Sequence, residues 1–402
     1  MKNKFLKGIG ANVIFLGLTS FINDISSDMV FAVMPFFITS LGGGGIAVGL
    51  ISGLGDSISG ILKVFSGYWS DKFSRKMPFV FGGYFISSIM KLLFPFAKAW
   101  STLAFLMPLE RMGKGLRTAP RDAVIATSAL ALSRGKAFGI HRTLDTLGAF
   151  LGALSAFFFF WFLKLELRAI LFIAAIIAFF ALFPLMFVKE KIATPQTLSL
   201  RINLKNLPLN FKRYLVAQTL FALGNFTYMF FVLKSKSVFD DIFSLRLSTA
   251  LPILFYVWFN IIYAFSSTPA GILSDKIGRK KTLILGYLIY ALTCAGFTLT
   301  NFWVIFIILF AMYGLSFGII EGVSRAYAAD FVPENLRGTA LGIFHTCVSL
   351  AVLPGGIIAG ILWNFNSNFT FIYGTALGIL SILFLMRVNP EEGRIRNENG
   401  NY

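Results

Sequence analysis

The stretch Gly67-Tyr-Trp-Ser-Asp71-Lys-Phe-Ser-Arg75-Lys76 occurs a second time, in altered form, as Gly271-Ile-Leu-Ser-Asp275-Lys-Ile-Gly-Arg279-Lys280. Its glycine and its aspartate are both displaced by 204 positions (271 − 67 and 275 − 71). Each copy places the same cluster of charges at the end of an apolar run. The repeat therefore indicates a duplicated chain, in which one loop design joins two helices in each half.

A second pair of similar segments supports the duplication. Arg134-Gly-Lys-Ala-Phe-Gly-Ile140 resembles Arg337-Gly-Thr-Ala-Leu-Gly-Ile343, and each segment opens the fifth apolar run of its half. Between Lys189 and Arg213 the apolar pattern lapses into polar and basic residues. We therefore expect an N-terminal six-helix half at residues 1–190, a cytoplasmic linker at 191–211, a C-terminal six-helix half at 212–388 and a cytoplasmic tail at 389–402.

The composition excludes a single soluble domain. Hydrophobic residues make up 56% of the 402 residues and charged residues only 13%, which is more apolar mass than one domain can hide from water. A spanning helix needs about 20 mostly apolar residues to cross about 30 Å of hydrocarbon. The pattern predicts an all-α membrane protein with twelve such helices, at 9–39, 45–69, 78–97, 100–130, 136–161, 167–188, 212–234, 248–272, 281–299, 302–328, 338–363 and 367–387.

The basic residues gather on one side of this twelve-span arrangement. By the positive-inside rule that side is cytoplasmic, so both termini are expected in the cytoplasm and the protein in the plasma membrane. The net charge of +18 is therefore interpreted as a mark of topology and not of nucleic-acid binding. The opposite side also carries basic residues, notably Lys98, Lys164, Arg168, Lys234, Lys236 and Arg246.

The repeated loop resembles a signature of the major facilitator superfamily, which reads Gly-x-x-x-Asp-Arg-x-Gly-Arg-Lys. The first copy departs from it at Ser74, and the second copy, with Gly278, fits better. The resemblance extends over essentially the whole chain and implies two six-helix halves related by a pseudo-two-fold axis. The segments 110–122 and 138–149 look like a branch of uncharacterised prokaryotic and archaeal permeases, which says little about substrate.

Gly67 and Gly271 are expected to let two backbones approach closely where a helix ends. Asp71 and Asp275 can accept from the exposed amides of a neighbouring helix N-terminus, and this contact would act as a latch between conformations. The resemblance implies that the partner helices begin near Gly338 for Asp71 and near Lys136 for Asp275. The alternative is that the basic residues of the loop only set topology.

The resemblance also implies two ion pairs beside the repeated loops. Arg75 is expected to pair with Asp122 at the cytoplasmic end of the fourth helix. Arg279 is expected to pair with Asp330 by analogy in the second half. Such pairs would help to hold one conformation closed.

Several carboxylates lie at membrane depth, where ionisable groups are costly and are functional candidates by default. Asp24 and Asp28 are four residues apart on the first helix and so share a face. Two carboxylates one turn apart cannot both ionise cheaply there, so one is expected to hold a proton, as a proton carrier requires; Na⁺ could use the same oxygens. Asp56 on the second helix is a further candidate for cation coupling. The alternative is that Asp28 is solvated or caps a neighbouring group near the outer mouth.

The fourth helix carries a stripe of cations that is unusual for a spanning helix. Their spacings of three, three and four residues put them on one face, which must meet an aqueous cavity or carboxylates. Arginine suits carboxylate or phosphate, so the stripe suggests an anionic substrate group. The stripe consists of Arg111, Lys114, Arg117 and Arg121.

The competing interpretation of the stripe is an internal ion-pair network. Asp145 on the fifth helix is expected roughly level with Arg121, and Glu110 could hold Arg111. Structural pairing is favoured for Arg121, and substrate contact for Arg111, Lys114 and Arg117 remains the hypothesis.

The second half carries fewer charges. Glu321 and Arg325, four residues apart on the tenth helix, are expected to satisfy each other, with substrate contact as the alternative. Asn225 and Tyr256 offer polar and aromatic groups at inner depth and are candidates for substrate binding. Charge on one half and aromatic groups on the other would suit an amphipathic anion.

The leading interpretation is a secondary transporter that moves a small organic solute by alternating access, driven by an H⁺ or Na⁺ gradient. No Walker-type phosphate loop, metal cluster or nucleophile constellation occurs, so no cofactor, metal or enzymatic activity is expected. Cys294 and Cys347 are interpreted as packing residues. A lipid-headgroup flippase or scramblase on the same fold is the alternative, followed by a membrane-embedded transferase. The partners expected are the bilayer and the solute, with no nucleic acid, for a monomer.

Overall fold

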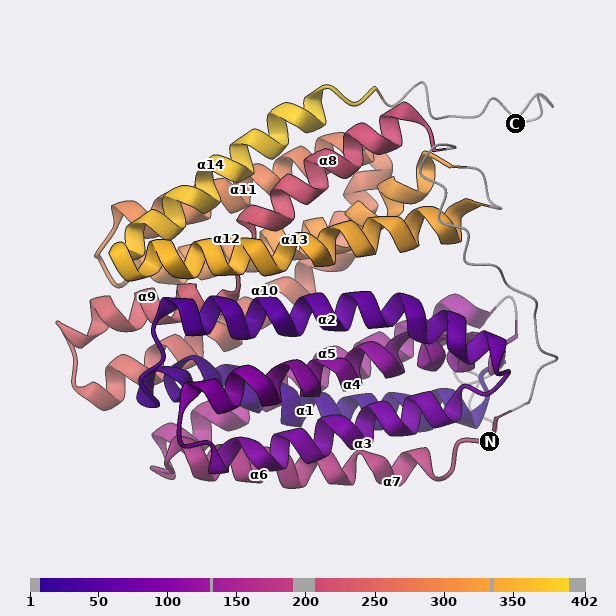
Figure 1. Cartoon of the computed structure of the whole chain (residues 1–402), viewed down its shortest axis with the longest axis horizontal. Coiled ribbons are helices and arrows are strands. Elements are labelled where there is room, and N and C mark those ends of the chain that lie inside the picture. The colour runs from indigo at the N-terminus through magenta and orange to yellow at the C-terminus, as the bar shows by residue number, and fades with distance from the viewer. Residues whose placement is uncertain (1–7, 131–132, 191–206, 333–335, 390–402) are drawn as a thin grey trace. The chain divides into compact units, whose positions relative to one another are not determined.

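The computed structural model describes residues 8–130, 133–190, 207–332 and 336–389 (Figure 1). The regular elements of these residues are helices, apart from one isolated bridge between Ile9 and Ala129. The all-α prediction is therefore confirmed. Most of the expected linker and of the expected C-terminal tail lie outside the described residues.

The helix bounds follow the apolar runs closely. In chain order they are α1 (Ala11–Ser40), α2 (Gly45–Lys72), α3 (Met77–Leu93), the 3₁₀ turn η2 (Phe94–Phe96), α4 (Trp100–Thr127), α5 (Arg134–Trp161), α6 (Leu167–Phe180), α7 (Leu182–Leu185), α8 (Leu209–Gly224), α9 (Tyr228–Asp240), α10 (Leu245–Ile277), α11 (Arg279–Leu299), α12 (Ile305–Asp330), α13 (Arg337–Phe365) and α14 (Ser367–Met386).

By length and composition, eleven helical segments of the described residues could cross a membrane. The expected span without a counterpart among the eleven is the fourth, because α4 carries the cation stripe and is too polar by composition. These segments make the chain a multi-pass membrane protein. The charges of α4 must find partners inside the protein if that helix also crosses the bilayer.

The seventh expected span, 212–234, is not one continuous helix. α8 ends at Gly224, where Asn225 adopts a non-helical backbone, and α9 begins at Tyr228. The sequence marks this interruption only by Gly224-Asn225 and by Thr227, whose hydroxyl caps the start of α9. Broken helices are tolerated at membrane depth only where the freed backbone groups face protein or a water-filled cavity.

The described residues form two compact units. The first takes in those of Met1–Ser199 and Thr227–Val257, and the second those of Leu200–Phe226 and Trp258–Tyr402. In the first unit α1 packs on α5 and α6, α4 packs on α2 and α3, and α9 contacts α1 and α2 (Figure 1). The halves assigned from the sequence, with their boundaries at 190 and 212, stay a prediction.

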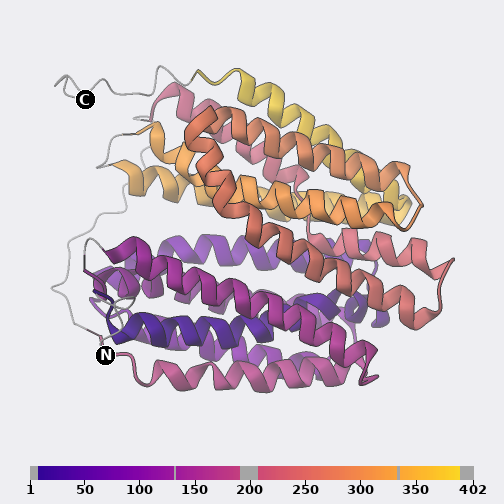
Figure 2. The ribbon, with the colours of Figure 1, turned by 180° about the vertical axis from the view of Figure 1, so that it is seen from behind.

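In the second unit α11 packs on α12 and α14, while α8 packs on α13 and α14. Figure 2 brings α10, α11 and α12 to the front. A ladder of stacked aromatic rings fills the interior of this unit, including Phe221 on Tyr287 at 4.2 Å between centroids and Phe297 on Phe371 at 5.2 Å. Apolar packing therefore dominates the second unit, whereas the charged groups concentrate in the first.

The repeated motif begins inside a helix in both copies. Asp71 lies in the last turn of α2 and Asp275 in the last turn of α10, so the loop proper starts later than the apolar runs suggest. The two loops share a left-handed residue at the corresponding position, Ser74 with φ 55° and Gly278 with φ 94°. Ser74 is buried, and its hydroxyl has no hydrogen-bond partner among the described residues.

This geometry predicts that Ser74→Gly stabilises the protein. A left-handed backbone costs a residue with a Cβ roughly 1–2 kcal/mol, part of which glycine loses again to the entropy of the unfolded chain. Removing an unsatisfied buried hydroxyl adds to the gain. We expect the free energy of unfolding in detergent to rise by about 1 kcal/mol, measured by thermal unfolding.

The matched control is Gly278→Ser, which should lower the stability by a similar amount. An unchanged or lower stability of Ser74→Gly would contradict the proposed strain in the first loop.

Candidate functional site

The close contact of α1 and α5 positions the first pair of candidate residues. A Cβ at Gly148 would collide with the carbonyl oxygen of Phe21, and one at Gly152 with that of Ile25. The two glycines therefore let the backbones meet along one turn of each helix. As a result the carboxyl groups of Asp24 of α1 and Asp145 of α5 lie close enough to interact directly.

The second carboxylate of α1 has a different set of partners. Asp28 is only 8% exposed and accepts a hydrogen bond of 3.0 Å from the hydroxyl of Tyr256. The ring of Tyr256 packs on Tyr228 with centroids 4.7 Å apart, and the Tyr228 hydroxyl donates to the carbonyl of Phe31 over 2.8 Å. Asp24 and Asp28 share a helix face, as predicted, but they reach different helices.

A serine on α1 connects four elements one turn below Asp24. The hydroxyl of Ser20 lies 3.0 Å from the Tyr84 hydroxyl of α3 and 3.0 Å from Nε2 of His141 of α5. It also accepts from Nη1 of Arg121 of α4 over 3.1 Å. The guanidinium of Arg121 pairs in addition with Asp122 at 2.9 Å.

Arg117 is held by uncharged partners. It is 3% exposed, its Nη1 donates to Ser87 over 2.7 Å, and its guanidinium stacks on the Tyr84 ring at 4.3 Å from the centroid. The Ser87 hydroxyl donates onward to the carbonyl of Glu110, so one serine links the side chain and the backbone of α4 to α3. Within the described residues no carboxylate lies within ion-pair distance of Arg117.

Lys91 of α3 is the most deeply buried cation of the first unit. It is 1% exposed, and its ammonium donates to the hydroxyls of Ser26 and Ser27 over 3.1 and 2.8 Å. It also interacts electrostatically with the buried Glu110. Lys91 of α3 thus bonds two serines of α1 and also interacts electrostatically with Asp24 and Asp28.

Arg111 reaches towards α1 and α2. Its guanidinium lies 4.4 Å from the ring centroid of Phe31, and its Nη2 is 3.5 Å from Oδ1 of Asp56. The distance is longer than that of a tight bidentate pair, and the Asp56 side chain is 47% exposed. Asp56 was a candidate for cation coupling and here has an arginine as its partner. Lys114, between these positions on α4, is exposed.

The stripe of α4 therefore diverges. Arg111 meets α1 and α2, Arg117 meets α3, and Arg121 meets α1 and Asp122 of its own helix. Asp145 interacts electrostatically with Arg121, in line with the expected level placement, and it also pairs with Arg142 at 3.8 Å and contacts Asp24. The helical pitch puts the Cα atoms of these cations on one face of α4, but their long side chains extend towards different partners.

The sequence did not single out the neutral residues that organise this network. Ser20, Tyr84 and Ser87 are each buried and each serve a charged or ionisable group. The serines could have been noticed in the sequence, because hydroxyl side chains on one face of an apolar helix indicate a polar contact with a neighbouring helix.

Of the candidates near the repeated loops, several have defined partners. Arg279 pairs with Asp330, which confirms that expectation, and Arg279 also donates to the carbonyl of Ala326 over 2.7 Å. Glu321 and Arg325 pair at 3.0 Å, as expected, and Tyr263 donates to the same carboxylate.

The pairing of Arg75 with Asp122 is wrong. Asp122 pairs with Arg121, and in the described part of the chain no ion pair joins it to Arg75, which is exposed beyond the end of α2. A carboxylate does lie beside this loop: Glu190 accepts hydrogen bonds from the backbone amides of Lys76 and Met77. These amides are at the start of α3, where unpaired N–H groups favour an anion.

The glycines of the motif differ between the copies. A Cβ at Gly67 would lie 3.3 Å from Cβ of Ala119, so α2 and α4 approach closely there. No atom of its own unit lies within 4 Å of that position at Gly271, and the expected close approach stays a prediction because the helix expected as its partner belongs to the other unit.

Asp71 pairs with Lys76 at 3.6 Å. The partner helices expected for Asp71 and Asp275 belong to the other unit in each case, so the latch stays a prediction. Asn225 lies at the break between α8 and α9, and its side-chain oxygen is buried without a hydrogen-bond partner among the described residues.

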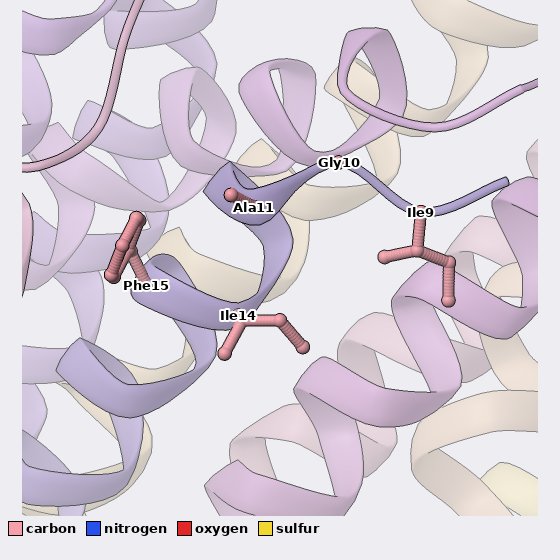
Figure 3. Close-up of a pocket in the computed structure, with 5 residues that line it drawn as sticks. All are labelled: Ile9, Gly10, Ala11, Ile14 and Phe15. Atoms are coloured by element: carbon pink, nitrogen blue, oxygen red, sulfur yellow. The ribbon is translucent and has the colours of Figure 1, made fainter. Parts of the chain in front are cut away.

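Hollows at the ends of the helices add little to this network. One of about 350 Å³ lies at the start of α1 and is lined by Ile9, Gly10, Ala11, Ile14 and Phe15 (Figure 3). Its lining has no polar side chain and offers no groups for specific recognition. In the described residues no group of three or more His, Cys, Asp or Glu side chains could hold a metal ion.

Comparison with known proteins relates this architecture to one family. A model described as Major Facilitator Superfamily matches residues 16–257 and 214–401. An uncharacterized MFS-type transporter of Methanocaldococcus jannaschii is 44% identical over 379 residues, which cover 94% of this chain and 95% of that protein.

Two crystal structures share the fold at low identity. The nucleoside transporter NupG matches with a TM-score of 0.76 at 14% identity and covers 94% of this chain and 98% of its own. A D-xylose-proton symporter matches with a TM-score of 0.72 at 18% identity and covers 94% of this chain and 97% of its own. Such identities carry no information about the substrate.

Proposed function

The chain belongs to the Major Facilitator Superfamily, and from this membership we propose that it is a secondary active transporter that moves a small organic solute by alternating access. The observation that carries the proposal is the buried network of ionisable groups in the first unit. Such groups are costly inside a membrane protein and are retained where ions or polar solutes pass. The proposal includes twelve spans in two six-helix halves, with α4 as the charged span.

We propose that a cation gradient drives transport and that H⁺ is the coupling ion. Two carboxyl groups in hydrogen-bond contact need a proton between them, because a carboxylate only accepts. We propose that the neighbouring carboxyl groups of Asp24 and Asp145 make such a contact, and Lys114 and Asp28 also interact electrostatically with Asp24. A conformational change that separates the two carboxyls would release the proton. Na⁺ bound by the same oxygens is the variant of this mechanism that the experiment must distinguish.

The groups proposed to meet the solute are Arg111 and Lys114 of α4, with the aromatic side chains of Tyr228 and Tyr256 beside them. Arg111 stacks on Phe31 and has Asp56 as a distant partner, so an incoming carboxylate or phosphate could replace that partner. Arg117 is buried against Ser87 and Tyr84, and we now assign it to the support of this site. The solute inferred is a small anion with an apolar or aromatic part.

The proposal for the cellular setting follows the charge distribution. Both termini lie in the cytoplasm, the host membrane is the plasma membrane, and the protein works as a monomer without cofactor or nucleic acid. The ion gradient is the energy source.

The coupling proposal predicts the behaviour of Asp24→Asn. A ligand is first found by thermal-shift screening of purified protein against a metabolite and drug panel at several pH values. In proteoliposomes, accumulation driven by a pH gradient should fall at least about tenfold in Asp24→Asn, while ligand exchange without a gradient continues, because only the proton site is lost.

Asp240→Asn, a change at an exposed carboxylate at the end of α9, serves as the matched control and should leave accumulation intact. Accumulation driven by a Na⁺ gradient and not by a pH gradient would identify Na⁺ as the coupling ion. Accumulation by Asp24→Asn equal to that of the parent would overturn the assignment.

The solute proposal predicts a loss of affinity in Arg111→Ala. Losing a charge-assisted hydrogen bond costs roughly 1.5–3 kcal/mol, or about 10- to 150-fold in affinity. The ligand concentration at the midpoint of thermal stabilisation should rise by that factor, with Lys98→Ala as a control at an exposed lysine. An unchanged midpoint in Arg111→Ala and in Lys114→Ala would remove the anion site.

A further inference from the structure

A basic hollow lies at the end of the first unit opposite the repeated loop. α1 ends there at Ser40, α5 ends at Trp161 and α6 begins at Leu167, whereas α2 returns to the other end with Asp71. The hollow has a volume of about 360 Å³. Its lining residues are Phe37, Ser40, Phe160, Lys164, Leu165, Glu166, Leu167, Arg168 and Arg246.

The lining carries an excess of positive charge. Three cations, Lys164, Arg168 and Arg246, face one carboxylate, Glu166, and no ion pair within the described residues joins that carboxylate to any of them. In the orientation proposed above, this end is the non-cytoplasmic one, where basic residues are disfavoured. Their concentration in one hollow therefore calls for a reason other than topology.

The two arginines are fixed by neutral groups and keep their charge uncompensated. Arg168 donates to the carbonyls of Pro95 and Ala97, the latter over 3.0 Å, and stacks over Phe37 at 5.4 Å. Arg246 donates to the carbonyl of Phe160 over 2.6 Å and lies over that ring at 5.3 Å. Each guanidinium retains further N–H donors, and Nε of Arg246 has no partner among the described residues.

The start of α6 adds backbone donors to the same hollow. Its first intrahelical bond runs from the amide of Ile170 to the carbonyl of Glu166, and no side chain caps the helix. The amides of Leu167 and Arg168 are therefore open to a ligand, at the end of the helix where an anion is favoured. Apolar side chains, Phe37, Phe160 and Leu165, form the remaining wall.

We infer that this hollow binds a phosphate group, presented either by the headgroup of an anionic membrane lipid or by a free phosphate ester. Guanidinium forks and open helix amides match phosphate oxygens, and a basic pocket at a helix end lies at the depth of lipid headgroups. The apolar wall suits the first atoms of an acyl chain. The site lies apart from the Asp24 and Arg111 network; it uses the proposed orientation but does not rest on the proposed solute or coupling ion.

The test uses the purified full chain in detergent and the variant Lys164→Asn. Lys164 has a left-handed backbone with φ 58°, which asparagine tolerates well, so the change removes the charge with little strain. Thermal stabilisation by dioctanoyl-phosphatidylglycerol should be saturable in the parent, and its midpoint should rise about five-fold in Lys164→Asn. Lys164→Arg, which retains the charge, should bind like the parent.

The matched control is Lys98→Asn, because Lys98 is an exposed lysine at the same end but outside the lining. Its midpoint should equal that of the parent. The thermal stability of each variant is also measured without lipid, to separate a weakened site from a damaged fold. Arg246→Gln, a second change in the lining, should likewise weaken the binding of phosphatidylglycerol.

Two further ligands identify the source of the phosphate. If sodium phosphate stabilises the parent saturably and Lys164→Asn weakens this effect, the ligand is a free phosphate ester. If phosphatidylglycerol stabilises the protein and sodium phosphate does not, the ligand is a lipid. Equal effects of dioctanoyl-phosphatidylcholine and phosphatidylglycerol, no saturable effect in the parent, or equal losses in Lys164→Asn and Lys98→Asn would each overturn the inference.

Discussion

Ionisable side chains inside a hydrocarbon layer must find their partners within the protein, and the first unit is organised by this constraint. Its buried cations and carboxylates are not matched one to one. Lys91 and Arg117 depend on serine hydroxyls and an aromatic ring, while Asp24 depends on another carboxyl group. Uncharged partners fix a charge in position without neutralising it. The network therefore keeps charge available inside the protein, as a transporter requires.

The close packing of the helices makes this arrangement possible. Gly148 and Gly152 bring α5 against the backbone of α1, and the contact of Asp24 with Asp145 follows from that spacing. On the other side of α1, serines 26 and 27 face Lys91. A shift of α1 would therefore alter the contact of Asp24 with Asp145 and the surroundings of Lys91 together. In this way a conformational change could release or bind a proton.

Much of the fold could be predicted from the sequence, because apolar length and charge asymmetry are local properties. The duplicated Gly-x-x-x-Asp loop predicted the family, and Arg279 with Asp330 followed from it. The break after Gly224 was missed, although Gly224-Asn225 and the capping Thr227 are residues typical of helix ends. The partners of the α4 cations were also beyond a sequence argument: helix pitch places Arg111 and Arg121 on one stripe, whereas side-chain length and the neighbouring helices decide that they diverge.

The central claim is that Asp24 and Asp145 hold one proton between them inside the first unit. Infrared difference spectroscopy of the purified protein measures protonated carboxyl groups directly, through their C=O stretching band and its shift in D₂O. The account predicts such a band at neutral pH, absent in both Asp24→Asn and Asp145→Asn and retained in Asp122→Asn. A band that persists in both of the first two variants, or a parent protein without any protonated carboxyl at neutral pH, would contradict it.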